Sequence, residues 1–243
     1  MLEELDRLAE QGMLDELVAR ASTALPGATD ELRLELHHYL AWAWFEMGDF
    51  ARSLEHARLA DDPLDESKAL FHLWRLDEAR AALADCGDEA EAHWYRSLVA
   101  EFTGGDARPG LRRAVELAPE RYHLPPRLDK QEMERVVRHA LGQLPSTLEW
   151  IVQEAVILIH PLPEPHPDVD PLSLGLYVGQ DITQRSVSDG MREPSRIEIY
   201  QQNIERVSRD ADEAAEELRI TLLHEMGHHF GFDEDGVERL GLA

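Results

Sequence analysis

The chain has 243 residues, enough for one or two domains with a substantial core, and Cys86 is its only cysteine, which excludes an intramolecular disulfide bond. Its 24 lysine and arginine residues stand against 49 aspartate and glutamate residues, so the formal net charge is −25. A charge of this size repels phosphate backbones and anionic lipids, so we expect neither nucleic acid nor a membrane surface as a partner.

Residues 1–122 consist of short amphipathic segments rich in Ala, Leu, Glu and Arg, a composition that favours helices. A small turn followed by a helix with spaced alanines recurs four times, with anchors at Gly12, Gly48, Trp74 and Gly105. The anchors are 36, 26 and 31 residues apart, which scatters around the tetratricopeptide period of about 34 residues. This half resembles degenerate tetratricopeptide repeats, which implies stacked helix pairs and a protein or peptide as the binding partner.

The aromatic side chains and the histidines of this half are interpreted as packing or surface residues. Aromatic residues at helical spacing usually belong to a hydrophobic core and not to a ligand groove. The aromatic residues are Tyr39, Trp42, Trp44 and Phe45, and the histidines are His37, His38, His72 and His93.

A change in composition separates this half from the rest of the chain. The segment Pro119–Asp129 contains three prolines, which cannot continue a helix. We therefore predict two domains, helical repeats over residues 1–122 and a second domain over residues 129–243. Because helices alternate with strand-like runs in the second domain, the expected class is α+β, an all-α repeat domain followed by a small α+β domain.

The second domain is predicted to begin with a helix that Asp129 caps and that ends before Pro145. The apolar stripe of this helix consists of Met133, Val136, Val137 and Leu141. The next apolar run, residues 155–160, is continuous and ends at a proline, so it predicts a buried strand.

The proline-rich stretch 161–171 is predicted to be an exposed connection without helix or strand. Two further short strands are expected near residues 174–179 and 196–201, with a polar loop between them. The last long helix is expected to begin at residues 210–212 and to end at Gly231, because glycine suits the end of a helix.

This last helix contains the motif H-E-x-x-H at His224, Glu225 and His228. Residues four apart lie one turn apart on the same face of a helix, so both imidazoles can reach one ion. Zinc accepts such nitrogen ligands and keeps a water molecule in the fourth position of a catalytic site. Glu225 is rotated from His224 by about 100°, beside the metal face, where its carboxylate can take a proton from that water.

A third protein ligand is needed, and only 15 residues follow His228. Gly231 allows the chain to turn back beneath the metal. The extended pattern H-E-x-x-H-x-x-G-x-x-E then selects Glu234 as the third ligand. Asp233 and Asp235 flank this position and stay open as alternatives.

Residues 130–243 together resemble the bacterial minimal zincin family of small zinc metallopeptidases. The resemblance is carried by the order and spacing of the segments ERVVRHALGQLP, AVILIH, LGLYVGQDITQRS, RIEIYQ and TLLHEMGHHFGFDED. It implies a short domain of one helix, a small sheet and the motif helix, with zinc held by two histidines and a downstream acid.

Two functions agree with these residues. In the first, the protein is a zinc metallopeptidase in which His224, His228 and Glu234 hold Zn²⁺ and Glu225 is the general base. The repeats then recruit a protein partner or substrate. In the alternative, the protein is a non-catalytic interaction scaffold with a structural or vestigial zinc site. Glu225 favours the enzyme, because a structural zinc site needs no base beside its ligands.

The sequence does not select the residue that would stabilise an oxyanion. Tyr177, Tyr200 and Arg185 have the chemistry of an oxyanion-stabilising residue, but no spacing selects one of them.

No secretory signal is recognisable at the N-terminus, and no apolar run approaches the ~20 residues of a membrane span, so we expect the cytoplasm as the compartment.

Overall fold

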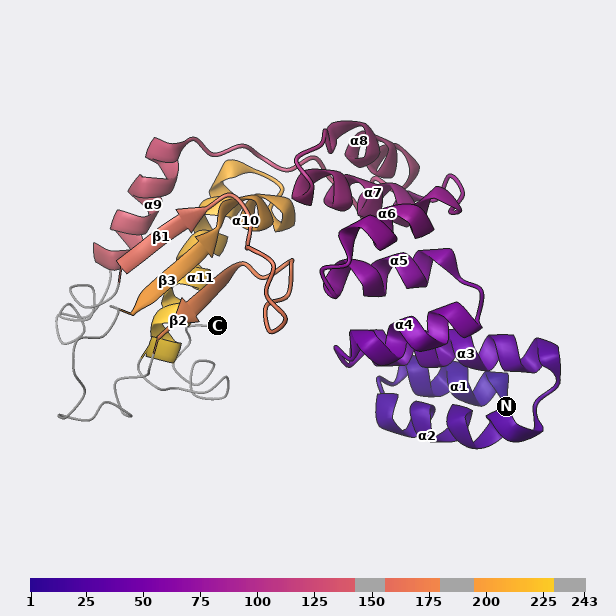
Figure 1. The fold of residues 1–243 in the computed structure, drawn as a ribbon. Helices are drawn as coiled ribbons and strands as arrows, with labels where there is room; N and C mark the ends of the chain where they lie inside the picture. The colour runs from indigo at the N-terminus through magenta and orange to yellow at the C-terminus, as the bar shows by residue number, and fades with distance from the viewer. Residues whose placement is uncertain (143–155, 180–194, 230–243) are drawn as a thin grey trace. The chain divides into compact units, whose positions relative to one another are not determined.

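The computed structural model describes residues 1–142, 156–179 and 195–229. The chain divides into two compact units, the first made of Met1–His123 with Pro165–Asp170 and the second of Leu124–Glu164 with Pro171–Ala243. The first unit is helical and the second combines helices with a small sheet, so the chain is α+β as predicted (Figure 1). None of the helices in the described part of the chain is long and apolar enough to cross a membrane.

The first unit is a stack of helices in which each helix packs mainly against its neighbours along the chain (Figure 1). This arrangement is compatible with helical repeats, while the assignment to tetratricopeptide repeats stays a prediction. The helices are α1 (Leu2–Glu10), α2 (Leu14–Ala24), α3 (Asp30–Glu46), α4 (Phe50–Leu59), α5 (Pro63–His72), α6 (Leu76–Ala84), α7 (Ala90–Phe102) and α8 (Arg108–Leu117), with a short 3₁₀ turn at Leu25–Gly27.

The four turns within the helix pairs share one backbone motif. In each turn a left-handed residue ends the first helix, and the next N–H donates to a carbonyl five residues earlier. Glycine occupies this position at Gly12, Gly48 and Gly104, with φ of +67°, +76° and +74°. The anchor predicted at Gly105 is therefore wrong by one residue, because the left-handed residue of the fourth turn is Gly104. Trp74 occupies the same position in the third turn, with φ +59°.

The sheet of the second unit contains β1 (Val156–His160), β2 (Gly175–Val178) and β3 (Arg196–Tyr200) in the order β1-β3-β2. β1 runs parallel to β3, and β2 runs antiparallel to it. The predicted strand positions are confirmed to within one residue. The expectation that β1 is buried is wrong, because β1 lies at an edge of the described sheet, Val156 is 44% exposed and the other four residues are only half-buried.

Three helices accompany this sheet, α9 (Lys130–Gly142), α10 (Gln201–Val207) and α11 (Ala211–His229). α9 begins with the predicted cap, because the Asp129 carboxylate accepts the N–H of Glu132 at 2.8 Å and the Glu132 carboxylate accepts the N–H of Asp129 at 2.9 Å. The core lies between one face of the sheet and helices α9 and α11. It contains Met133, Val137, Ile197, Ile199, Leu218, Leu222 and Met226, with Val136 and Leu141 packed against it.

The connection between β1 and β2 has neither helix nor strand, as its prolines predict. Pro161 and the middle of the connection, residues 164–168, are exposed. The expectation of an exposed connection is therefore wrong for Pro163 and Pro171, which are buried, and for Val169 and Asp170, which are half-buried. These residues contact other parts of the chain that a local pattern does not reveal.

Candidate metal and active site

α11 carries the candidate site, and its residues 221–227 are almost entirely buried. The helix is anchored at its start by the Asp210 carboxylate, which accepts the N–H groups of Asp212 at 3.0 Å and Glu213 at 2.9 Å. From Thr221 to Gly227 every residue is buried except His224, which is half-buried. A histidine and a glutamate are therefore fixed in a helix segment that packing holds in place.

His224 and Glu225 both line one pocket of about 370 Å³. The pocket lies between α11 and the residues that lead into β2. Its described lining consists of Ser173, Leu174, Gly175, Glu217, Ile220, Thr221, His224 and Glu225. Glu225 is 8% exposed, so its carboxylate lies in a sheltered environment where an electrostatic interaction is stronger than in water.

Gly175 permits the close approach of β2 to this helix. A Cβ atom at this position would lie 2.8 Å from Cγ2 of Thr221, 3.0 Å from Cγ of Glu225 and 3.1 Å from the carbonyl oxygen of Glu198. Each of these distances is shorter than ordinary carbon contacts, so a larger residue would displace the strand or the glutamate. The glycine therefore helps to set the position of Glu225 within the pocket.

α10 positions the other rim of the pocket through Asn203, which is 1% exposed. The Nδ2 group of Asn203 donates to the carbonyl oxygens of Pro171 at 2.8 Å and Ser173 at 2.7 Å. The N–H of Tyr200 donates to the carbonyl oxygen of Leu174 at 2.9 Å. No sequence pattern indicates α10 or Asn203, because the segment QQNIERV has only Ile204 and Val207 as apolar residues and shows no helical period.

Glu217 is a further pocket residue that the sequence analysis did not identify. It precedes His224 by seven residues, about two helical turns, and so shares its face of α11. Partial burial raises the pKa of the Glu217 carboxyl, and the negative charges of Glu213 and Glu216 raise it further. The sequence signal that could have identified Glu217 is its spacing of seven residues from His224, a candidate metal ligand.

The other predicted ligands are only partly within the described structure. The backbone of α11 includes His228, one turn after His224. Glu234 and its alternatives Asp233 and Asp235 lie outside the described residues. The predicted ligand set therefore stays a prediction.

Two of the three oxyanion candidates have other partners. The hydroxyl of Tyr177 donates to Ser195 at 3.1 Å, and that of Tyr200 donates to Glu198 at 2.9 Å. Burial raises the pKa of Tyr200, and so do the hydrogen bond to Glu198 and the charges of Glu198 and Glu225. Neither tyrosine belongs to the described lining of the pocket, and Arg185 lies outside the described residues.

Comparison with known proteins finds a family match within the second unit. Residues 152–242 match the model of a family described as zincin-like metallopeptidase. The match contains the whole described sheet, α10, α11 and the H-E-x-x-H motif. No curated protein matches the chain.

Proposed function

We propose that this protein is a zinc-dependent peptidase in which His224, His228 and Glu234 hold Zn²⁺ and Glu225 is the general base. The observation that carries this proposal is that His224 and Glu225, neighbours in α11, both line the same pocket. The family match supports the same chemistry, because members of a metallopeptidase family cleave peptide bonds with a metal.

The residues of the pocket fit a zinc ion by their donor chemistry. Neutral imidazole nitrogens and a carboxylate oxygen are the usual protein ligands of catalytic zinc. His224 is half-buried at the pocket, and the helical spacing puts position 228 on the same face of α11. Bound zinc would polarise the scissile carbonyl and lower the pKa of a bound water molecule to about 7.

Glu225 supplies the proton chemistry in this proposal. Its carboxylate accepts a proton from the attacking water and then returns it to the leaving amine. The Glu225 side chain is buried and its Cγ lies beside Gly175 of β2, which limits the positions open to the carboxylate. A base held in one position lowers the entropic cost of proton transfer.

The edge of the sheet favours a peptide as the substrate. Among the described strands, β2 is paired with β3 on one side only, and its first residue, Gly175, lines the pocket. An extended peptide can add to such an edge through backbone hydrogen bonds. A peptide bond paired there would lie beside His224 and Glu225.

The remaining parts of the proposal concern partner and compartment. We assign to the helical unit the recruitment of a protein partner or substrate, supported by its stack of neighbouring helices. We also assign the protein to the cytoplasm, where a chain with a single cysteine is ordinary.

The substitution Glu225→Gln tests the proposal, because it keeps the size of the side chain and removes the base. We expect hydrolysis of unfolded proteins and peptide libraries to fall ~100-fold or more, with zinc content unchanged. Glu217→Gln is the matched control in the same pocket and is expected to keep most of the activity. Wild-type protein that holds zinc but cleaves none of these substrates would favour the scaffold function instead.

A further inference from the structure

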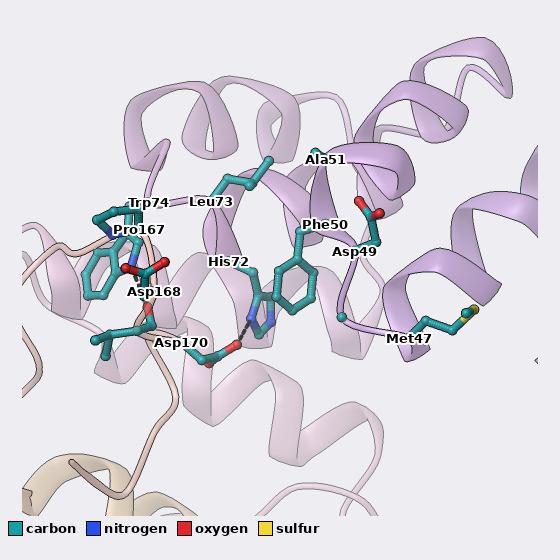
Figure 2. A pocket seen from close by; sticks show the side chains of 12 residues that line it. Met47, Asp49, Phe50, Ala51, His72, Leu73, Trp74, Pro167, Asp168 and Asp170 are labelled. Carbon is teal, nitrogen blue, oxygen red and sulfur yellow. Dashed lines mark hydrogen bonds and ion pairs between the residues drawn. The ribbon is translucent and has the colours of Figure 1, made fainter. Parts of the chain in front are cut away.

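The segment Pro165–Asp170 belongs to the first unit, although it lies between β1 and β2 in the sequence. Two residues hold it, His72 at the end of α5 and Trp74 in the turn that follows. The indole Nε1 of Trp74 donates to the carbonyl oxygen of Val169 at 2.8 Å. Nδ1 of His72 lies 2.6 Å from a carboxylate oxygen of Asp170 (Figure 2).

His72 is presented to the segment by a set of aromatic rings. Its side chain is 8% exposed and stacks on Phe50 with a distance of 4.4 Å between ring centroids. Phe45 and Phe71 meet the imidazole edge-on at 5.1 Å and 5.5 Å. The orientation of the imidazole is therefore fixed by packing, so little rotamer entropy is lost when a carboxylate binds to it.

Trp74 occupies its position at a conformational cost. The equivalent residue of the other three turns is glycine, and a side chain with φ of +59° is disfavoured by about 1–2 kcal/mol. Strain that persists in a fold often marks a functional residue. In this turn the strained residue makes the hydrogen bond that holds Val169.

The bound segment has the properties of a preorganised peptide ligand. Pro165 and Pro167 restrict its backbone, and the N–H groups of Asp168 and Val169 donate to His166 within the segment at 3.2 Å and 3.1 Å. The Asp168 side chain is 88% exposed and turns to solvent, whereas Asp170 contacts His72. Recognition thus includes one carboxylate and one backbone carbonyl.

The segment does not fill the surface that holds it. A pocket of about 630 Å³ lies between the segment and the ends of α3, α4 and α5. Met47, Phe50, Leu73 and Trp74 line it from the helical side (Figure 2), and Pro167 and Val169 line it from the segment. The space admits side chains larger than those of Pro165–Asp170.

We infer that the surface around His72 and Trp74 is a binding site for an acidic, proline-containing turn of a partner protein, and that Pro165–Asp170 occupies it as an intramolecular competitor. This inference rests on the recruiting role proposed for the helical unit and names the chemistry of the partner. The tethered segment has an effective concentration in the millimolar range, so a partner must bind better or the segment must be weakened.

The test measures binding of a fluorescent peptide, PLPEPHPDVDPL, which repeats residues 161–172. The full-length chain carries Glu225→Gln throughout, so that binding is read without hydrolysis. We expect weak binding to the parent chain and about tenfold or tighter binding after Asp170→Asn in the chain, because the tethered competitor loses its charged hydrogen bond. Asp168→Asn in the chain is the matched control and leaves the affinity unchanged.

Two variants of the surface keep the inference falsifiable. Adding His72→Gln or Trp74→Gly to Asp170→Asn removes the gain in affinity, and circular dichroism reports whether the helices persist. Trp74→Gly provides the residue that the other three turns use, so the fold is retained. Equal affinity in the parent and Asp170→Asn chains, a gain that survives Trp74→Gly, or no binding to any chain overturns the inference. None of these results would contradict the proposed peptidase activity. Conversely, a protein that shows no peptidase activity would not contradict the proposed binding site.

Discussion

Gly175 and Glu225 lie against each other so closely that the strand leaves no room for a methyl group beside the glutamate side chain. The contact joins the edge strand of the sheet to the helix that carries the metal motif. The position of the proposed base is therefore sensitive to the size of a residue that has no chemistry of its own.

Gly175→Ala is expected to destabilise the protein by about 1–3 kcal/mol, because the added Cβ overlaps Thr221 and Glu225. Hydrolysis should fall as well, since the glutamate is displaced. Denaturant unfolding and peptidase assays measure the two effects. Thr221→Ser removes the Cγ2 atom and should restore part of the stability. Gly142→Ala is the control, because nothing lies within 4 Å of its Cβ position.

One zinc ion per chain is the expected content of protein purified without chelator. Glu234→Ala should lower the zinc affinity far more than Asp233→Ala or Asp235→Ala, because only Glu234 fits the extended motif. Metal analysis and chelator competition measure this. If Asp233→Ala lowers the zinc affinity more than Glu234→Ala, the predicted position of the third ligand is wrong by one residue. If the protein holds no zinc even after zinc is added, the predicted zinc site is wrong.

Glu205→Ala is expected to destabilise the second unit by about 2–4 kcal/mol. The Glu205 carboxylate is buried and accepts hydrogen bonds from Arg127 at 2.8 Å, the N–H of Leu128 at 2.9 Å and Gln201 at 2.8 Å. Removing it leaves a buried N–H without an acceptor. Urea unfolding measures the loss, and Glu216→Ala, at an exposed ion pair, should change stability by less than about 0.5 kcal/mol.

Sequence patterns predicted the elements whose signals are local. Turn glycines such as Gly12 and Gly48 marked the helix pairs, and the N-cap residue Asp129 marked the start of α9. Residues 155–159 form a continuous apolar run, which predicts a strand buried on both faces, so β1 was expected to be buried. Patterns of this kind carry no information on which strand lies at an edge.

Contacts between distant residues had no local signal. The hydrogen bond from Trp74 to Val169 joins residues 95 positions apart, and the one from His72 to Asp170 joins residues 98 positions apart. The sequence predicts that His72 is a packing or surface residue. This agrees with its aromatic neighbours, but it does not include the contact with the carboxylate of Asp170. The close approach of Gly175 to Glu225 was missed for the same reason.

Stability of the first unit is expected to fall as the pH is lowered through about 6.5. His37 and His56 contact each other through their Nδ1 atoms at 2.9 Å. Burial lowers the pKa of both; the charge of Arg33 lowers that of His37 further, the charge of His37 lowers that of His56, and Glu55 opposes both shifts.

The sign of this effect follows from proton linkage. Below the ordinary histidine pKa the unfolded chain binds more protons than the folded chain, so acid favours unfolding. Denaturant unfolding between pH 7 and pH 5 measures the effect. His56→Asn should flatten the pH dependence, whereas the same change at the exposed His166 should leave it unaltered. A profile that stays steep in His56→Asn contradicts the assignment.

Limited proteolysis is expected to cut the chain first within residues 120–129. Glu120 and Arg121 are exposed at the end of the helical unit, so a glutamate-specific protease and trypsin each have a site there. Mass spectrometry of the first fragments identifies the cuts. Early cuts elsewhere in the described residues, with none in this segment, would mean that the predicted domain boundary is wrong.

The six residues Pro165–Asp170 also determine how the protein can be dissected. No uninterrupted stretch of the gene encodes the complete first unit, so a fragment that stops at His123 leaves His72 without Asp170 and Trp74 without the carbonyl of Val169. A faithful version needs a rearranged gene, in which codons 165–170 follow codon 123 through a flexible linker and a second linker replaces them between Glu164 and Pro171. If the chain were simply cut after His123, both fragments would therefore differ from the native units.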